Sequence, residues 1–178
     1  MDYILFQLIN NLAGKWWFLD LFGVFCAEYL IFAMAFAAGG LLFIYKDDAQ
    51  KRIHREVFLK VSSAVGLSYI LKIIIQLIHQ RPRPFVNHDV LQLVDKSAGS
   101  ASFPSGHTVL AFAIAFSIYF YNKKLGAIFL VLAMLAGLGR IYVGVHYPLD
   151  VLGGVLLGCF SAYVVGKIPW NKFLSSKL

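Results

Sequence analysis

Charged residues are scarce in this sequence: Lys, Arg, Asp and Glu make up 14% of its 178 residues, and hydrophobic residues make up 60%. Such a composition is wrong for a soluble globular domain. Apolar runs near or above the ~17 to 25 residues that span a bilayer recur several times. The sequence therefore predicts an integral membrane protein, mostly helical because helices satisfy their own backbone hydrogen bonds in lipid.

Cysteine and acidic residues are also few. Cys26 and Cys159 each lie inside an apolar run, where a free thiol behaves as a small hydrophobe, so we expect neither a disulfide nor a metal site. The net charge is +7, yet the basic residues lie in short segments between apolar runs rather than on one aromatic-interleaved face. Nucleic acid is therefore not predicted as a partner, and neither a cofactor nor an obligate protein partner is indicated.

The length predicts a single domain, residues 1–178. Residues 1–20 carry apolar side chains at helical spacing and then two tryptophans, which predicts an interfacial helix. We expect an all-α membrane bundle of about five spans, with an external loop at 80–104. The predicted spans are residues 21–45, 57–79, 105–121, 125–138 and 149–166.

Two basic segments set the predicted orientation of the bundle. Residues 46–55 and 122–124 are short and rich in Lys and Arg, and the positive-inside rule places both in the cytoplasm. With five spans, the N-terminus and the loop 80–104 then lie outside, and the C-terminus lies inside.

Three ionisable residues stand in the stretch Gly139–Asp150, between two apolar runs. Such groups beside a bilayer are costly unless they pair or face a wet cavity, so they are candidates for function. We interpret His146 as a nucleophile toward phosphorus, Asp150 as the carboxylate that orients it, and Arg140 as a clamp on phosphate oxygens. Pro148 as the first helical residue puts Asp150 in the opening turn of the next helix.

The same residues also have a purely structural interpretation. Asp150 then complements a helix N-terminus, Arg140 anchors at the lipid headgroups, and His146 caps a turn. From this stretch alone, the two interpretations are about even.

The segment Pro104–His107 opens the third predicted span and favours the chemical interpretation. Backbone N–H groups at a helix N-terminus form a cradle for phosphate, with Gly106 allowing close approach and the Ser105 hydroxyl donating. His107 in that first turn faces the same anion, where it can protonate the departing lipid oxygen and later activate water. The five-span topology puts it on the same side of the membrane as His146.

Four further polar residues are candidates for this site. Arg83 is expected to bind phosphate, and Arg81 offers a second cation at the end of the same span. Lys72 lies towards the end of the second predicted span, where it either reaches the phosphate or extends to the membrane interface. Glu28 in the first span either serves the site, by holding an arginine or protonating part of a headgroup, or forms a bundle hydrogen bond. The bundle role is slightly favoured.

These residues resemble the signatures of the type 2 phosphatidic acid phosphatases. Pro-Ser-Gly-His matches completely at Pro104–His107. Ser-Arg-x5-His-x3-Asp matches at Arg140, His146 and Asp150, with Gly139 in place of the serine. A hydroxyl donor to phosphate is therefore missing at that position.

The remaining family signature, Lys-x6-Arg-Pro, fits only in part. Arg83 and Pro84 match its end, but the position seven residues before Arg83 holds Gln76. Lys72 lies one helical turn further back and shares a face with Gln76. We therefore expect this protein to differ from its relatives in phosphate binding rather than in nucleophilic attack.

The resemblance covers about residues 72–158. It implies a helical membrane enzyme that removes a terminal phosphate from a lipid through a phosphohistidine, without a metal. The patterns Ile9–Gly14 and Ala27–Tyr29 are similar to bacterial undecaprenyl-diphosphate phosphatases of this family. That likeness implies the bacterial cytoplasmic membrane, with the site facing the periplasm or exterior.

Other substrates and one other function class remain open. Lipid A 1-phosphatases and phosphatidylglycerophosphate phosphatases use the same machinery on other lipids. A non-catalytic anionic-lipid binder or small transporter also needs a cationic pocket. It has no use for the pair His107 and His146 with Asp150 behind one of them, which disfavours that class.

Overall fold

The computed structural model describes residues 1–40 and 47–170, and this part of the chain contains helices and no strands. The helices are α1 (Asp2–Asn10), α2 (Trp17–Val24), a π-helical turn η1 (Phe25–Tyr29), α3 (Leu30–Gly40), α4 (Asp48–Ile78), α5 (Pro84–Asn87), α6 (Gly106–Tyr121), α7 (Lys123–Tyr142) and α8 (Pro148–Gly166).

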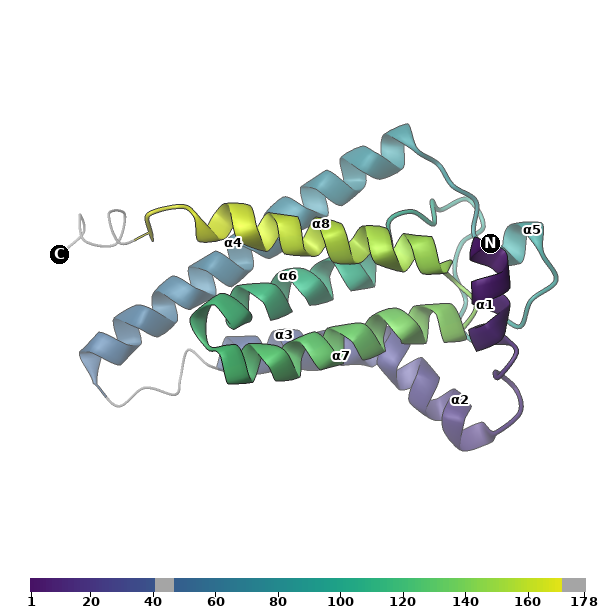
Figure 1. Cartoon of the computed structure of the whole chain (residues 1–178), viewed down its shortest axis with the longest axis horizontal. Helices are drawn as coiled ribbons and strands as arrows, with labels where there is room; N and C mark the ends of the chain where they lie inside the picture. The colour runs from purple at the N-terminus through teal and green to yellow at the C-terminus, as the bar shows by residue number, and fades with distance from the viewer. Residues whose placement is uncertain (41–46, 171–178) are drawn as a thin grey trace.

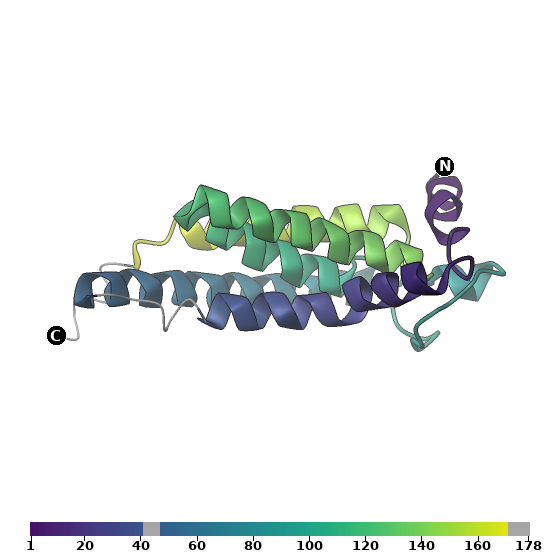
Figure 2. The same cartoon turned by 90° about the horizontal axis from the view of Figure 1, so that it is seen from below.

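The long helices form an elongated bundle, and α1 lies across one of its ends (Figures 1 and 2). Helix α6 occupies the middle, since it packs against α3, α4, α7 and α8. Gly154 and Gly158 allow α8 to approach it closely: a Cβ built at Gly158 lies 2.5 Å from the carbonyl oxygen of Val109, and one at Gly154 lies 2.8 Å from Cβ of Thr108. Glycine at these two positions therefore lets the backbone of α8 lie directly against α6.

Four helical stretches are long and apolar enough to cross a membrane, and α6 is a shorter apolar helix. The four stretches are Trp17–Gly40, Ala49–Ile78, Lys123–Tyr142 and Pro148–Gly166. Many large apolar side chains on their outer faces are exposed, including Phe36, Ile128, Val131, Leu156 and Phe160. Exposed apolar surface of this extent suits contact with lipid. The all-α membrane bundle predicted from the sequence is confirmed.

The start of the second long helix differs from the prediction. The basic segment expected to be a loop belongs mostly to α4, which starts at Asp48 and has 31 residues. Asp47 caps it by accepting a hydrogen bond from the backbone N–H of Gln50 at 2.8 Å. A helix of this length extends about 46 Å, against about 30 Å for the hydrocarbon core, so its basic first turns can emerge from the bilayer.

The fourth span also differs from the prediction. Helix α7 runs to Tyr142 rather than 138, so Arg140 lies in its last turn and not in an external loop. The sequence rule ended the helix before a charged residue. Inside the protein, the cation of Arg140 is compensated by Glu28, 112 residues away, and the helix continues.

The N-terminal region departs from prediction as well. The expected single helix over residues 1–20 is divided, because α1 ends at Asn10 and α2 already begins at Trp17. The first span starts four residues earlier than predicted, and its predicted end at residue 45 falls outside the described residues. The π-helical turn interrupts this span at Phe25–Tyr29. Such turns occur often at functional sites, and this one carries Glu28.

Candidate active site

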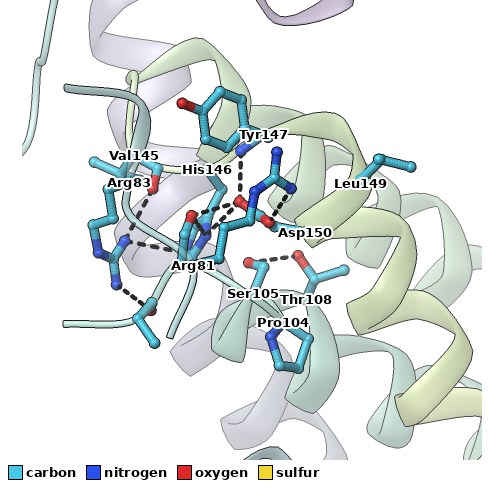
Figure 3. Close-up of polar contacts among 12 residues, drawn as sticks. Arg81, Arg83, Pro104, Ser105, Thr108, Val145, His146, Tyr147, Leu149 and Asp150 are labelled. Carbon is cyan, nitrogen blue, oxygen red and sulfur yellow. Dashed lines mark hydrogen bonds and ion pairs between the residues drawn. The ribbon is translucent and has the colours of Figure 1, made fainter. Parts of the chain in front are cut away.

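The polar residues of the three sequence signatures meet at the end of the bundle where α1 and α5 lie (Figures 1 and 3). They come from the end of α4 with the segment that follows it, the start of α6, the last turn of α7, the connection between α7 and α8, and the start of α8. These distant segments of the chain therefore lie together at one end of the bundle.

His146 lies in the short connection between α7 and α8 and is almost fully buried. Its Nε2 atom is 3.3 Å from Nη1 of Arg83. A guanidinium can only donate, so Nε2 is the unprotonated acceptor and Nδ1 carries the ring proton. Burial, helped by the charges of Arg140 and Arg83, lowers the pKa of His146 to about 3. The imidazole is therefore neutral at physiological pH, with a free electron pair on Nε2.

Asp150 stands on the other side of this ring, in the first turn of α8, and has no exposed surface. Its Oδ2 atom accepts from the backbone N–H of Tyr147 at 2.8 Å and from the hydroxyl of Ser102 at 2.5 Å. The same oxygen is 3.6 Å from Nδ1 of His146, slightly too far for a direct hydrogen bond. Bonds of this kind often tighten only when substrate is present.

Arg83 is held almost entirely by neutral groups. Its Nε donates to the hydroxyl of Ser100 at 2.9 Å, Nη1 to the carbonyl of Val145 at 3.0 Å, and Nη2 to the carbonyl of Ala101 at 3.4 Å. Burial and the charge of Arg140 lower the pKa of Arg83 to about 10, which leaves it charged at neutral pH. A buried cation without a carboxylate on its fork keeps its charge available for an anion.

Arg140 is 1% exposed, and its side chain crosses from α7 to the π-helical turn. Nη1 donates to the carbonyl of Ala27 at 3.1 Å and pairs with the carboxylate of Glu28. Its Nε is buried and has no hydrogen-bond partner among the described residues. Leaving such a donor unpaired is costly, so this nitrogen is well suited to bind a phosphate oxygen.

Glu28 therefore pairs with Arg140, a residue of the candidate site. Its second oxygen is 3.2 Å from Nζ of Lys96, a residue of the segment between α5 and α6. The contact between Glu28 and Arg140 is itself a hydrogen bond between two helices of the bundle, so the favoured structural role stays a prediction. The alternative, that Glu28 holds an active-site arginine, matches the geometry.

The start of α6 brings the Pro104–His107 segment next to these cations. A Cβ built on Gly106 lies 3.5 Å from Cε of Lys72, so Lys72 reaches the first turn of α6 instead of extending away from it. The hydroxyl of Ser105 accepts from the hydroxyl of Thr108 at 3.0 Å, which leaves its own proton free to donate.

His107 is half-buried in this first turn of α6. The charged side chains that act on it electrostatically are those of Arg140, Glu28, Lys96 and Arg83. The second histidine of the sequence prediction thus lies within the same group of charges as the arginine clamp.

Arg81, predicted to bind phosphate, and Gln76, a possible supporting residue, both bind other protein groups in the structure. Gln76 donates to the carbonyls of Ala101 and Pro104, at 3.3 and 3.4 Å, and so fastens α4 to the segment before α6. Arg81 directs both terminal nitrogens at carboxylates: Nη1 at Oδ1 of Asp150, 2.7 Å away, and Nη2 at Oδ2 of Asp2, 2.6 Å away. Because these contacts occupy the amide of Gln76 and the guanidinium of Arg81, neither group is free to bind phosphate in this structure.

Comparison with known proteins places the chain in a family. The model of the PAP2 superfamily matches residues 57–174. The chain belongs to the PAP2 superfamily. Undecaprenyl-diphosphatase BcrC of Bacillus subtilis (strain 168) is 34% identical over 164 residues, covering 92% of this chain and 82% of the relative.

Two further proteins are similar over nearly the whole chain. The bacitracin transport permease protein BcrC of Bacillus licheniformis is 37% identical over 175 residues, which are 97% of this chain and 83% of that protein. The crystal structure of Aquifex aeolicus LpxE superposes with a TM-score of 0.74 at 32% identity, covering 94% of this chain and 95% of the other. The family resemblance carried by the sequence signatures is confirmed.

Gly139, the departure from the third PAP2 signature, has a steric explanation. A Cβ built there lies 2.8 Å from the backbone nitrogen of Ala27 and 3.0 Å from Cβ of Cys26. Real Cβ atoms rarely come this close, so a serine does not fit without separating α7 from η1. Glycine at this position lets the π-helical turn approach α7 and bring Glu28 to Arg140.

Three residues of the site were missed in the sequence. Ser102 lies between Asp150 and His146, with its hydroxyl also 3.4 Å from Nδ1 of the histidine. Lys96 and Asp2 lie in segments that carry no motif. Their partners are 68 and 79 residues away along the chain, so no local spacing indicates them.

Proposed function

We propose that this protein hydrolyses the terminal phosphate of a membrane lipid by way of a phosphohistidine at Nε2 of His146. The observation that carries the proposal is the arrangement around that atom: an unprotonated nitrogen faces a buried arginine, and a carboxylate lies behind the protonated nitrogen of the same ring. This is the arrangement that a nitrogen nucleophile needs.

Substrate binding falls to the cations and to the N-terminus of α6. Arg83, Arg140 through its unpaired Nε, and Lys72 bind the non-bridging oxygens of the phosphate. The backbone N–H groups around Ser105 and Gly106, together with the Ser105 hydroxyl, complete the cradle. On binding, Nη1 of Arg83 exchanges its contact with Nε2 for one with a phosphate oxygen.

The first chemical step forms the bond from Nε2 of His146 to phosphorus and breaks the bond to the lipid-side oxygen. That oxygen takes a proton from His107 as it leaves. The imidazole gains positive charge in this step, and Asp150 stabilises it by accepting from Nδ1–H. In the second step, neutral His107 takes a proton from water, whose oxygen attacks phosphorus and releases inorganic phosphate and free His146.

The proposed substrate is undecaprenyl diphosphate, converted to undecaprenyl phosphate. The relative named undecaprenyl-diphosphatase, similar over most of both chains, supports this choice. The headgroup chemistry of the site suits lipid A 1-phosphate and phosphatidylglycerophosphate equally, so a substrate panel has to decide between them. The substrate panel compares kcat/KM of the purified protein for these three lipids.

We propose further that the site faces the periplasm or exterior of a bacterial cytoplasmic membrane. The first turns of α4 and of α7, which carry basic residues, lie at the other end of the bundle (Figure 1). Such residues are enriched on the cytoplasmic side. Labelling a cysteine introduced at exposed Gly99 with a membrane-impermeant thiol reagent on intact spheroplasts tests this placement.

A binder or transporter of anionic lipids is the competing function, and one relative is named a permease. Phosphate release separates the two. Purified wild-type protein is expected to release phosphate from undecaprenyl diphosphate, while His146→Ala releases none and still binds the lipid. Binding without release by the wild type overturns the enzymatic proposal.

A further inference from the structure

Helix α1 is fastened to the end of the bundle that carries the candidate site. Phe6 is fully buried and packs with Ile141, Tyr147 and Val151. Asn10, at the other end of the helix, donates from Nδ2 to the carbonyl of Tyr142 at 2.9 Å. The helix therefore packs as part of the bundle and fixes the position of its first residue, Asp2.

Asp2 makes two contacts with the machinery around Asp150. Its Oδ2 atom pairs with Nη2 of Arg81 at 2.6 Å, and its Oδ1 atom accepts from the backbone N–H of Leu149 at 3.0 Å. Arg81 in turn pairs through Nη1 with Oδ1 of Asp150 at 2.7 Å, and its guanidinium lies 4.1 Å above the ring of Tyr147. Both terminal nitrogens of Arg81 are thus shared between two carboxylates.

We infer that Asp2 is a positioning residue for catalysis, which acts through Arg81 on the carboxylate of Asp150. This inference rests on the proposed function of Asp150 as the partner of His146. The N-terminal helix lies outside all three sequence signatures, yet through Asp2 it helps to set the position and charge of Asp150.

Geometry gives the first reason for such a role. Oδ2 of Asp150 is fixed by Ser102 and Tyr147, and Oδ1 is fixed by Arg81. Arg81 contacts Asp150 through Nη1 alone, because its Nη2 is bound to Asp2. Without Asp2, the free fork can turn and bind both oxygens of Asp150, which pulls the carboxylate away from Nδ1 of His146.

Charge gives the second reason. Asp2, Arg81 and Asp150 together carry one negative charge. That charge stabilises the imidazole as it becomes positive during attack on phosphorus. If Asp2 is replaced by a neutral residue, Arg81 neutralises Asp150 alone and the stabilisation is lost. The effect belongs to the transition state, so it changes kcat more than KM.

The test is a double-mutant cycle with Asp2→Asn and Arg81→Gln, assayed by phosphate release from undecaprenyl diphosphate. We expect Asp2→Asn to lower kcat about tenfold with KM nearly unchanged, which corresponds to about 1.4 kcal/mol of barrier. In the Arg81→Gln background, Asp2→Asn should have no further effect. An undiminished effect in that background, or a wild-type kcat for Asp2→Asn, overturns the inference.

Asp20→Asn is the matched control. Asp20 also comes from the N-terminal region, and its Oδ1 accepts from the backbone N–H of Gly14 at 2.9 Å and from the hydroxyl of Tyr142 at 2.6 Å, away from Asp150. This variant should lower Tm while kcat stays within about twofold of the wild type. A kcat loss in Asp20→Asn equal to that in Asp2→Asn shows a general structural effect and overturns the specific role.

A conservative variant covers the case in which Asp2→Asn fails to fold. Asp2→Glu keeps the charge beside Arg81, so it should fold and retain most of kcat; a tenfold loss in a stable Asp2→Glu protein contradicts the inference. His146→Ala separates this inference from the proposed function. Activity in His146→Ala removes the function itself, whereas an inactive His146→Ala beside a normal Asp2→Asn removes only the role of Asp2.

Discussion

Nη1 of Arg83 lies 3.3 Å from Nε2 of His146. This contact fixes the tautomer of the histidine before substrate arrives, because the arginine can only donate. It also keeps the arginine one short movement from the phosphate that Nε2 is to attack. The same side chain thus prepares the nucleophile and binds the group that the nucleophile receives.

Arg83→Lys removes the planar fork while keeping a positive charge. The lysine cannot donate to Ser100, Val145 and His146 at once, so we expect kcat/KM for the lipid diphosphate to fall by about 100-fold. Steady-state phosphate release measures the loss. Arg52→Lys, in the first turns of α4 at the far end of the bundle, is the control and should be close to wild type. Near wild-type kcat/KM in Arg83→Lys contradicts the role of the fork.

Gly139→Ser restores the residue of the family signature, but we expect it to impair the protein. The new Cβ meets the backbone of Ala27, so the helices must separate and Arg140 loses its fit with Glu28. Both Tm and kcat/KM should fall. Gly39→Ser is the matched control, because a Cβ there meets nothing within 4 Å. An increase of activity in Gly139→Ser disproves the steric explanation.

Glu28→Gln keeps the shape of the side chain and removes its charge. Arg140 then loses an ionic partner, and its side chain is free to leave its present position, in which the buried Nε has no hydrogen-bond partner among the described residues. We expect kcat/KM to fall about 10-fold to 100-fold, as for loss of a hydrogen bond between charged groups. Turnover and Tm are measured separately. A lower Tm with unchanged turnover means that Glu28 serves the bundle alone.

Acid should destabilise the protein through His146. Its pKa is lowered to about 3 in the folded state, against about 6.5 in an unfolded chain. Between these values the unfolded state binds the extra proton, so this contribution to stability is complete above pH 6.5 and is lost as the pH falls towards 3, by up to about 1.4 kcal/mol per pH unit. Tm in detergent, measured from pH 7 to 4, should fall less steeply for His146→Gln. Parallel curves for the two proteins contradict the assignment.

The sequence predicted the residues whose relation is local. Pro148 marks the start of α8, and the spacing of four residues from His146 to Asp150 places the carboxylate in its first turn. Pro104 and Ser105 likewise predicted the helix N-terminus at Gly106. These assignments depend on backbone chemistry within a few residues, which a single sequence contains.

The contacts that escaped prediction join residues far apart in the chain. Arg140 was predicted to lie in a loop, because a buried arginine needs an ionic partner and no acidic residue close to position 140 indicates one. The partner is Glu28, far away in the sequence. Arg81 was expected at the phosphate because its two carboxylate partners, Asp2 and Asp150, become neighbours only when α1 packs against α8. From the sequence, Gly139 was only a departure from the family signature. The close packing of η1 against α7, which leaves no space for a Cβ at this position, explains it.

The central claim is a covalent phosphohistidine at His146, and rapid quenching tests it most directly. Purified protein is mixed with undecaprenyl diphosphate labelled with 32P at the terminal phosphate, stopped with alkali within milliseconds, and digested for peptide analysis. We predict a label that is stable to base and labile to acid, on the peptide containing His146, and absent in His146→Ala. Phosphate release by His146→Ala at the wild-type rate, or labelled wild-type enzyme whose phosphate sits on another residue, contradicts the account.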